Sequence, residues 1–185
     1  EAESAPSHGV GSTTHLSVLD AAGNAVSLTT TNGEGCGEML PRSGFMLNNM
    51  LGEADLSPGG FHRHPPGNRL PTMMAPTIVR RDGEPVLVTG TGGSNRIGPV
   101  MVQVLANVLS RGMGLEEAIL APRVHCDGGV IHLEEGFPLA EWDEARLNRV
   151  NAWPGRSLFF GGAHSVSPTV AVGDPRRSGC ALEFD

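Results

Sequence analysis

The stretch TTHLSVLDAAGNAVSLTTT, residues 13–31, decides how this chain begins to fold. Two runs of alternating apolar and polar residues flank the short segment Ala21-Ala22-Gly23. Glycine suits the last, left-handed position of a three-residue hairpin loop. The pattern therefore predicts a β-hairpin. If Asp20 pairs with Asn24, Thr13 lies directly across from Thr31.

This register divides the side chains of the hairpin between two faces. Leu16 pairs with Leu28 and Val18 with Val26 on one face, which forms a coherent apolar surface. A sheet face that carries only small and polar side chains is most often solvated, so we expect the opposite face to lie in water. That polar face consists of Thr13, His15, Ser17, Ser27, Thr29 and Thr31.

The composition points to one globular domain and excludes several kinds of partner. The chain has 185 residues, enough for a single ordinary domain. Gly (26) and Pro (14) separate apolar runs, as expected of a loop-rich fold. With a net charge of −7 and no basic block, nucleic acid is not expected as a partner. No apolar run approaches the roughly 20 residues that cross a bilayer, so we expect no membrane span in this chain.

The residue types also exclude some chemistry. The chain has no Lys and no Tyr, which excludes Schiff-base and pyridoxal chemistry, a phosphate-loop lysine and a tyrosine nucleophile. Seven His are present without a helical ligand pair or a Cys/His ligand set, so neither a metal site nor a cofactor is expected. The three cysteines can form at most one bridge, which leaves the redox compartment and the localisation open.

Beyond the first hairpin, the hydrophobic pattern predicts strands mixed with two helical layers. A long irregular segment over 52–75 is of the kind that is usually functional or mobile. We expect strands at 44–50, 76–81, 85–90, 123–126, 130–133, 157–160, 167–172 and 180–184, and helices at 97–109, 115–121 and 139–150, with Ser94 or Asn95 capping the first helix.

Two consecutive glycines, Gly92 and Gly93, lie between a predicted strand and the best predicted helix. Exposed backbone N–H groups at a helix N-terminus suit an anion or a developing oxyanion. As a bare feature, such a turn is structural more often than functional. The dinucleotide and phosphate-loop patterns both fail here, because Asn95 replaces the third glycine and no lysine follows.

The remaining candidate for chemistry is Thr13, at the start of a predicted strand after a small, polar lead-in at 1–12. Threonine acts as a nucleophile when its own α-amino group, with a pKa of about 8, serves as the base. That amine must be free. The hypothesis therefore requires cleavage of the peptide bond between Ser12 and Thr13.

Residues 13–27 closely resemble the start of the small subunit of γ-glutamyltranspeptidases, which are N-terminal nucleophile hydrolases. The resemblance implies an α/β fold, the four-layer αββα sandwich, of which 13–185 would be the small-subunit catalytic domain. Residues 1–12 would then be a leader, the end of the large-subunit segment. Further matching motifs are SG (43–44), LNN (47–49), PTIV (76–79), VTG (88–90), GGS (92–94), APR (121–123) and DPR (174–176).

This resemblance also implies an activity. A precursor cleaves itself before Thr13, and the freed threonine attacks the γ-glutamyl amide of glutathione or a related compound; water or an amino acid then resolves the acyl-enzyme. Thr31 matches the second catalytic threonine of the family, and Gly92 and Gly93 match its oxyanion glycines. The implied partner is the large subunit of the same precursor, so the isolated half is expected to expose apolar surface.

The residues that match the glutamyl-binding positions depart from the family pattern. Thr72 and Met73 stand where a pair of serines is common, and Glu53 replaces the usual Asp. Met50 replaces a Gln, while Asn32 matches the Asn that follows the second threonine. Two alternatives to γ-glutamyl transfer therefore stay open. One is an acylase of the same family that removes a glutaryl-like group, and the other is a non-catalytic binding or assembly subunit.

Overall fold

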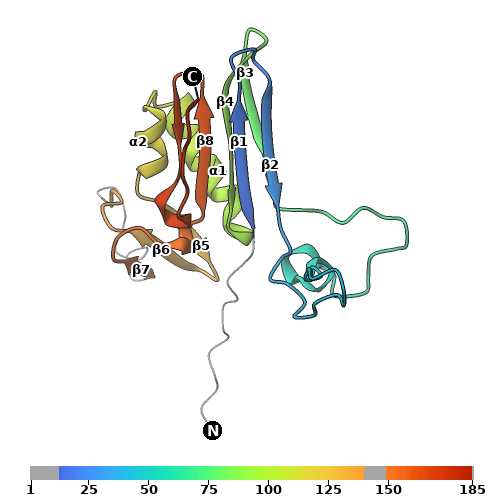
Figure 1. Cartoon of the computed structure of the whole chain (residues 1–185). Helices are drawn as coiled ribbons and strands as arrows, with labels where there is room; N and C mark the ends of the chain where they lie inside the picture. Colours follow the sequence, from blue (N-terminus) through green and yellow to red (C-terminus); the bar gives the residue numbers. More distant parts are fainter. Residues whose placement is uncertain (1–12, 140–148, 185) are drawn as a thin grey trace.

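The computed structural model describes residues 13–139 and 149–184. In these ranges nine strands form three sheets. A two-stranded sheet lies beside a four-stranded sheet, and a small three-stranded sheet lies below them (Figure 1). The fold is therefore a mixed α/β fold, as predicted.

The first hairpin consists of β1 (Thr14–Leu19) and β2 (Ala25–Thr30). Its register is the predicted one, with Leu16 opposite Leu28 and Val18 opposite Val26. The loop is stabilised by the Asp20 carboxylate, which accepts hydrogen bonds from two backbone N–H groups further along the loop. Alternation and loop chemistry are both local, so the register could be predicted without tertiary information.

The four-stranded sheet is antiparallel throughout. The sheet contains the second hairpin of the chain, β3 (Thr77–Arg81) and β4 (Glu84–Gly92), which was predicted. The stretch 167–172, predicted as one strand, contains the last residue of β8 (Gly162–Ser167), a turn and β9 (Val170–Val172). β4 and β8 lie side by side at the centre of this sheet.

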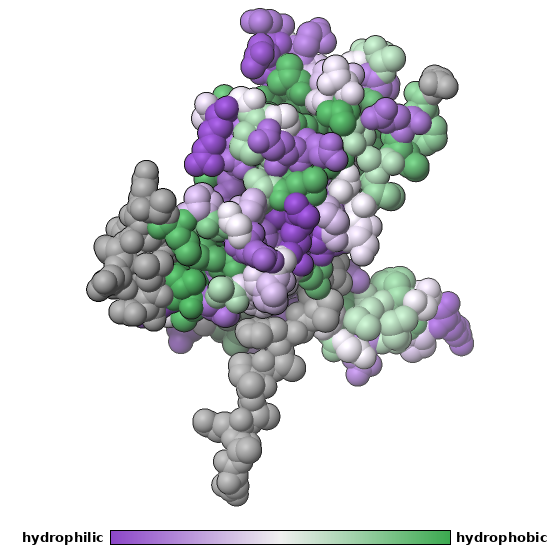
Figure 2. Space-filling view, turned by 90° about the vertical axis from the view of Figure 1, so that its left-hand side faces the viewer, coloured by the Kyte–Doolittle hydropathy of each residue, from purple (hydrophilic) through white to green (hydrophobic). Residues whose placement is uncertain are grey.

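Two helices, α1 (Ile97–Leu109) and α2 (Leu115–Leu120), cover one face of the four-stranded sheet (Figure 1). Apolar residues at helical spacing on α1 face the strands. The core comprises Leu87, Val100, Val104, Leu115, Ile119, Ala163 and Val172. The face seen from the α2 side mixes hydrophilic and hydrophobic side chains (Figure 2). Neither Ser94 nor Asn95 caps α1, because the 3-10 turn η3 (Ser94–Arg96) precedes it and no side-chain cap bond forms.

The hairpin covers the other face of this sheet, so the described residues form three layers: hairpin, sheet and helices. Ser17 Oγ donates to the His164 carbonyl at 3.0 Å, and Ser27 Oγ donates to the Thr89 carbonyl at 3.0 Å. Within the described ranges, no helix lies on the outer face of the hairpin (Figure 1). The described residues thus show three layers, whereas the resemblance implies four. In this part of the chain β1 pairs only with β2, so the two strands form a separate two-stranded sheet.

The prediction that the polar face of the hairpin is solvated is wrong. His15 is only 6% exposed, whereas Leu16 and Leu28 on the apolar face are 54% and 51% exposed. The polar face packs against the sheet because its groups keep hydrogen-bond partners there: Ser17 and Ser27 bond carbonyl groups of the sheet, and the His15 imidazole bonds hydroxyl groups of its own hairpin. These bonds offset the cost of leaving water. The expected exposed apolar surface of this chain is therefore the outer face of the hairpin.

The remaining elements follow the predictions only in part. The third hairpin, β5 (Val124–Asp127) and β6 (Val130–Glu134), was predicted, whereas β7 (Val150–Trp153), parallel to β6, was not. Most of the helix predicted at 139–150 lies outside the described residues. The stretch 157–160 is not a strand but holds the 3-10 turn η4 (Leu158–Phe160), and 180–184 has no regular structure. The stretch 44–50 is likewise no strand, with only a single bridge between Met39 and Met46.

A cluster of four buried charges joins elements that are far apart in the sequence. Arg123 Nη2 lies 2.7 Å from Asp174 Oδ2, and Arg176 Nη2 lies 2.6 Å from Glu134 Oε2. All four side chains are almost fully buried. Asp174 also accepts from the backbone of Ala163 in β8 and caps the 3-10 turn η5 (Pro175–Arg177). The cluster therefore connects β6, β8, η5 and the segment after α2.

Removing one member of this cluster should destabilise the fold strongly. Asp174→Ala leaves two buried guanidinium groups without their shared carboxylate, so we expect a loss of about 3–5 kcal/mol in the free energy of unfolding. Urea denaturation measures this loss. The control is Glu116→Ala on the exposed side of α2, which should cost under about 1 kcal/mol. Equal effects of the two substitutions would contradict a structural role of the cluster.

Candidate active site

Two threonine hydroxyl groups meet where β1 begins and β2 ends. The hairpin register places Thr13 across from Thr31, and their Oγ1 atoms lie 2.8 Å apart in a hydrogen bond. Both residues are half-buried. Thr31 Oγ1 also accepts a hydrogen bond from Gly33 N at 2.9 Å. The predicted pairing of these two residues is therefore confirmed, whereas their chemical roles stay predictions.

The glycine turn at the end of β4 lies against Thr13. A Cβ added to Gly92 would lie 2.5 Å from the Thr13 carbonyl oxygen, so only glycine allows the two segments to approach this closely. Gly93 has a φ of +146°, a conformation that side chains rarely adopt. Thr91 Oγ1 donates to Gly92 O at 2.8 Å and accepts from Gly162 N at 2.9 Å, which fixes the turn.

His15 lies in the interface between the hairpin and the four-stranded sheet. Its ring lies on Gly90, Nδ1 bonds Thr29 Oγ1 at 2.8 Å, and Nε2 bonds Ser17 Oγ at 2.9 Å. Burial, followed by the neighbouring His164, lowers the pKa of His15 to about 4. His15 is therefore neutral at pH 7. It stabilises the interface and adds no charge next to Thr13.

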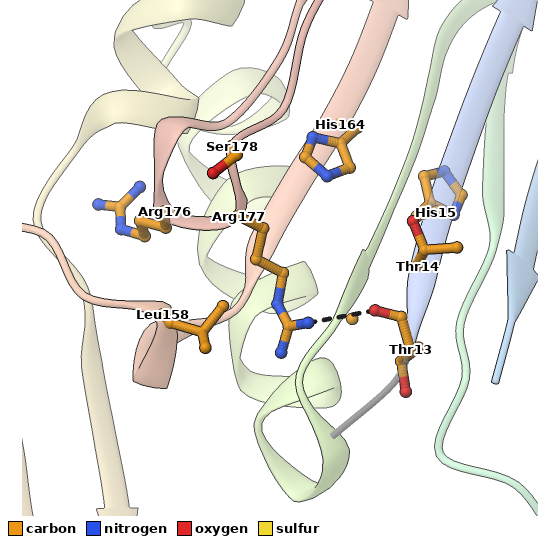
Figure 3. Close-up of a pocket in the computed structure, with 9 residues that line it drawn as sticks. Thr13, Thr14, His15, Leu158, His164, Arg176, Arg177 and Ser178 are labelled. Carbon is orange, nitrogen blue, oxygen red and sulfur yellow. Dashed lines mark hydrogen bonds between the residues drawn. The ribbon is translucent and has the colours of Figure 1, made fainter. Parts of the chain in front are cut away.

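A cavity of about 410 Å³ opens beside Thr13, between β1, β8 and η5 (Figure 3). Arg177 at the end of η5 lines it and reaches across to Thr13, where Nη1 donates to the Thr13 carbonyl oxygen at 3.1 Å. His164 and Ser178 also line the cavity. Sequence reasoning missed Arg177; its position directly after the DPR motif was the one available signal.

The residues between β2 and β3 form a lobe apart from the three layers, with the 3-10 turns η1 (Met50–Gly52) and η2 (Ala54–Leu56) (Figure 1). The lobe folds back on its own start: Asn49 N donates to Asn32 O at 3.2 Å, and Glu53 lies against Gly33. Burial, then Glu34 and Asp55, raise the pKa of Glu53. Asn32 and Glu53 are thus close to Thr31.

Thr72 and Met73 lie on the segment that leads from the lobe into β3. Thr72 is exposed and its hydroxyl accepts from Met74 N at 3.2 Å, while Met73 is half-buried. Among the described residues, no hydrogen bond joins Thr72 to Thr13 or Thr31. The structure therefore brings together Thr13, Thr31, the Gly92 turn, Asn32 and Glu53, and it does not join Thr72 and Met73 to them.

Three further observations concern the described part of the chain. None of its helices is long and apolar enough to cross a membrane. In the same residues, no three His, Cys, Asp or Glu side chains are grouped so that they could hold a metal ion. Cys36, Cys126 and Cys180 are each exposed and unbridged.

Residues 1–184 match the family model described as gamma-glutamyltranspeptidase. Acylase ACY 1 proenzyme of Pseudomonas sp. (strain SE83) is 41% identical over 130 residues, which cover 69% of this chain and 23% of that protein. Glutathione hydrolase proenzyme of Bacillus subtilis (strain 168) is 37% identical over 182 residues, covering 93% of this chain and 31% of the relative. The chain thus spans about a quarter to a third of the length of these relatives.

Solved structures give the same match in three dimensions. Gamma-glutamyltranspeptidase from Pseudomonas nitroreducens, complexed with L-DON, aligns with a TM-score of 0.73 and 31% identity over 93% of this chain and 100% of that chain. The transpeptidase CapD from Bacillus anthracis aligns with a TM-score of 0.69 and 27% identity over 92% of this chain and 99% of that chain. The fold of this chain is therefore similar to both.

The contact between Gly92 and Thr13 can be tested by adding one methyl group. Gly92→Ala places its Cβ against the Thr13 carbonyl, so one segment must move, and we expect a loss of about 1–3 kcal/mol in the free energy of unfolding. The control is Gly98→Ala on α1, where a Cβ meets nothing within 4 Å. This control should gain up to about 1 kcal/mol, because alanine favours a helix. Urea unfolding of both variants measures the difference, and an unchanged stability of Gly92→Ala would contradict the close approach.

Proposed function

The chain belongs to the gamma-glutamyltranspeptidase family, and from this premise we propose that it is the catalytic small subunit of a self-cleaving acyltransferase. Residues 13–185 would be the catalytic domain, with the cleavage site between Ser12 and Thr13. The observation that carries the proposal is the 2.8 Å contact between the Thr13 and Thr31 hydroxyl groups. Further support comes from the Gly92-Gly93 turn that packs against Thr13.

In the proposed self-cleavage, Thr13 Oγ1 attacks the Ser12 carbonyl and the peptide bond shifts to an ester. Water hydrolyses the ester and leaves Thr13 with a free α-amino group. Thr31, within hydrogen-bond distance of the attacking oxygen, would orient it and relay its proton to the departing nitrogen of Thr13. The Thr13 hydroxyl then serves as the nucleophile in both self-cleavage and turnover.

In turnover, the freed amine accepts the proton of the Thr13 hydroxyl, and the oxygen attacks the substrate amide. Such general-base assistance contributes about 10²–10⁴-fold in rate. The N–H groups of the Gly92-Gly93 turn would stabilise the oxyanion of the tetrahedral intermediate. The amine of the substrate takes up the proton and leaves, so an acyl ester stays on Thr13. Water or an amino acid then accepts the acyl group.

The substrate we propose is a γ-glutamyl amide, with glutathione as the typical compound. Glu53, half-buried against Gly33 near Thr31, would bind the α-ammonium group of a glutamyl chain. The second candidate is a glutaryl-type amide, which lacks that ammonium group. It is favoured by Met50 and Met73, and by the relative that is named an acylase.

We further propose that a large subunit from the same precursor completes the protein. The chain covers only 31% of the Bacillus subtilis proenzyme, so the relatives have residues that this chain lacks. The exposed apolar face of the hairpin, with Leu16 54% and Leu28 51% exposed, is the surface that such a subunit would cover.

Replacing the nucleophile should abolish both reactions. In the complete precursor, Thr13→Ala removes the attacking hydroxyl, so we expect no cleavage before residue 13 and no turnover. Thr13→Ser keeps an oxygen nucleophile and should cleave slowly. The control Thr14→Ala changes the adjacent, exposed threonine and should cleave normally. Intact-mass measurement decides the point, since two fragments divided before position 13 in the alanine variant would place the nucleophile elsewhere.

The donor can be identified by assaying γ-glutamyl-p-nitroanilide and glutaryl-p-nitroanilide with the cleaved protein. A charged hydrogen bond contributes about 1.5–3 kcal/mol, so Glu53→Gln should lower kcat/KM for the γ-glutamyl donor by roughly 10- to 100-fold. The same variant should leave the glutaryl donor nearly unchanged. The control is Glu38→Gln, an exposed carboxylate in the same lobe, which should change kcat/KM for neither donor.

The outcomes of this assay separate the three candidate functions. Preference for the glutaryl donor, with equal effects of Glu53→Gln on both donors, would make the protein an acylase. A correctly cleaved protein that turns over neither donor would support the non-catalytic binding or assembly subunit.

A further inference from the structure

We infer that Arg177 is a positioning residue: it holds the carbonyl group of Thr13 and places a positive charge beside the amine that self-cleavage would create. This inference rests on the proposed function, in which Thr13 becomes the N-terminal nucleophile. It goes beyond it by assigning a role to a side chain that neither the motif resemblance nor the threonine pair includes.

Arg177 contacts the proposed nucleophilic residue directly. Arg177 Nη1 donates to the Thr13 carbonyl oxygen at 3.1 Å, although 164 positions separate the two residues in the sequence. Figure 3 shows the guanidinium group lying between Leu158 and Thr13. Once the preceding peptide bond is cut, nothing on the N-terminal side holds Thr13. The orientation of Thr13 then depends on the hydrogen bond from Arg177, on the Thr31 hydroxyl and on the contact with Gly92.

Arg177 is itself held in place, so it can orient another residue. Its side-chain stem lies on Gly162 of β8, where an added Cβ would come within 2.7 Å of Arg177 Cβ and Cγ. Its backbone ends η5, whose N-cap Asp174 accepts from Arg176 N at 3.0 Å and belongs to the buried charge cluster. The rigid cluster thus fixes the turn that aims Arg177 at Thr13.

The charged groups near Thr13 leave Arg177 free to lower the pKa of the new α-amino group. Arg177 faces it from η5, His15 from β1 and His164 from β8. Arg176 points away from Thr13 (Figure 3) and is paired with Glu134 and Asp174, while the charge of Arg96 on η3 acts on Arg177. Burial lowers the pKa of His15 and of His164, so both rings are neutral near pH 7. The carboxylate of Asp174 is already paired with Arg123 and Arg176. The Arg177 charge should therefore lower the pKa of the new amine, so that a larger fraction of it is neutral and able to accept the hydroxyl proton.

The test compares Arg177→Met and Arg177→Lys in the complete precursor. Methionine keeps a stem that packs on Gly162 but removes the charge and the donor, whereas lysine keeps the charge. For Arg177→Met we expect kcat for γ-glutamyl-p-nitroanilide to fall about 10- to 100-fold, with KM changed less than about two-fold, because misplacing a reacting group lowers the rate more than binding. The acid limb of the pH profile of kcat/KM should move to higher pH. Arg177→Lys should keep that limb in place and recover part of kcat.

A matched control is Arg80→Met, which removes an exposed arginine that donates to a backbone carbonyl, Gly83 O, at 2.8 Å, far from the site. It should match the wild type in every measurement. Rates are expressed per cleaved chain, counted by intact mass. If the Arg177→Met precursor does not cleave, the variant is made instead as two co-expressed chains: the residues before Thr13, and a chain that begins at Thr13.

Two results would overturn the inference: wild-type kcat and pH profile in Arg177→Met, or equal losses in both Arg177 variants with the acid limb unmoved. The second result would mean that Arg177 only packs on Gly162. Thr13→Ala is measured in parallel. If that variant still cleaves before position 13, the proposed function fails; if it does not and Arg177→Met behaves like the wild type, only the role of Arg177 fails.

Discussion

Two glycines on one face of β4 set the distance between the hairpin and the sheet, and the rest of the site depends on this distance. Gly90 lies under the ring of His15, and Gly92 lies under the carbonyl of Thr13. A side chain at either position would push the hairpin away from the sheet. Because both positions lack a Cβ, β1 packs directly on β4. The start of β1 is thereby brought to the turn at the end of β4, where a helix follows.

The interface between the hairpin and the sheet is polar, although the interior of a sheet sandwich is usually apolar. Burying polar groups costs little when each finds a partner. Ser17 and Ser27 donate to carbonyl groups of the sheet, and His15 bonds two hydroxyl groups of its own hairpin. The apolar core lies instead between the sheet and α1. This division leaves hydroxyl groups in the layer that contains Thr13 and Thr31.

The residues around Thr13 come from remote parts of the chain, and a buried charge cluster keeps them together. Asp174 bonds β8, Arg123 and the turn η5, and Glu134 bonds Arg176 and the backbone before η4. Its members balance in charge, two arginines against two carboxylates, as buried ions require. The turn that carries Arg177 and the chain next to Gly161 are both positioned by it. Gly161 in turn contacts the Gly92-Gly93 turn.

Local patterns in the sequence were enough to predict the first hairpin, its register and therefore the pairing of Thr13 with Thr31. They also predicted α1 and the position of the Gly92-Gly93 turn, since apolar periodicity and glycine spacing act over a few residues. The tertiary structure alone decided which face of the hairpin is buried. Alternation gives two faces, and the polar one is buried because it finds hydrogen-bond partners on the sheet and room over Gly90 and Gly92. Arg177 and the four-charge cluster were not predictable either, because their partners lie up to 164 residues away and are chosen by packing. Sequence chemistry thus determined the candidate nucleophile, and long-range packing determined what surrounds and orients it.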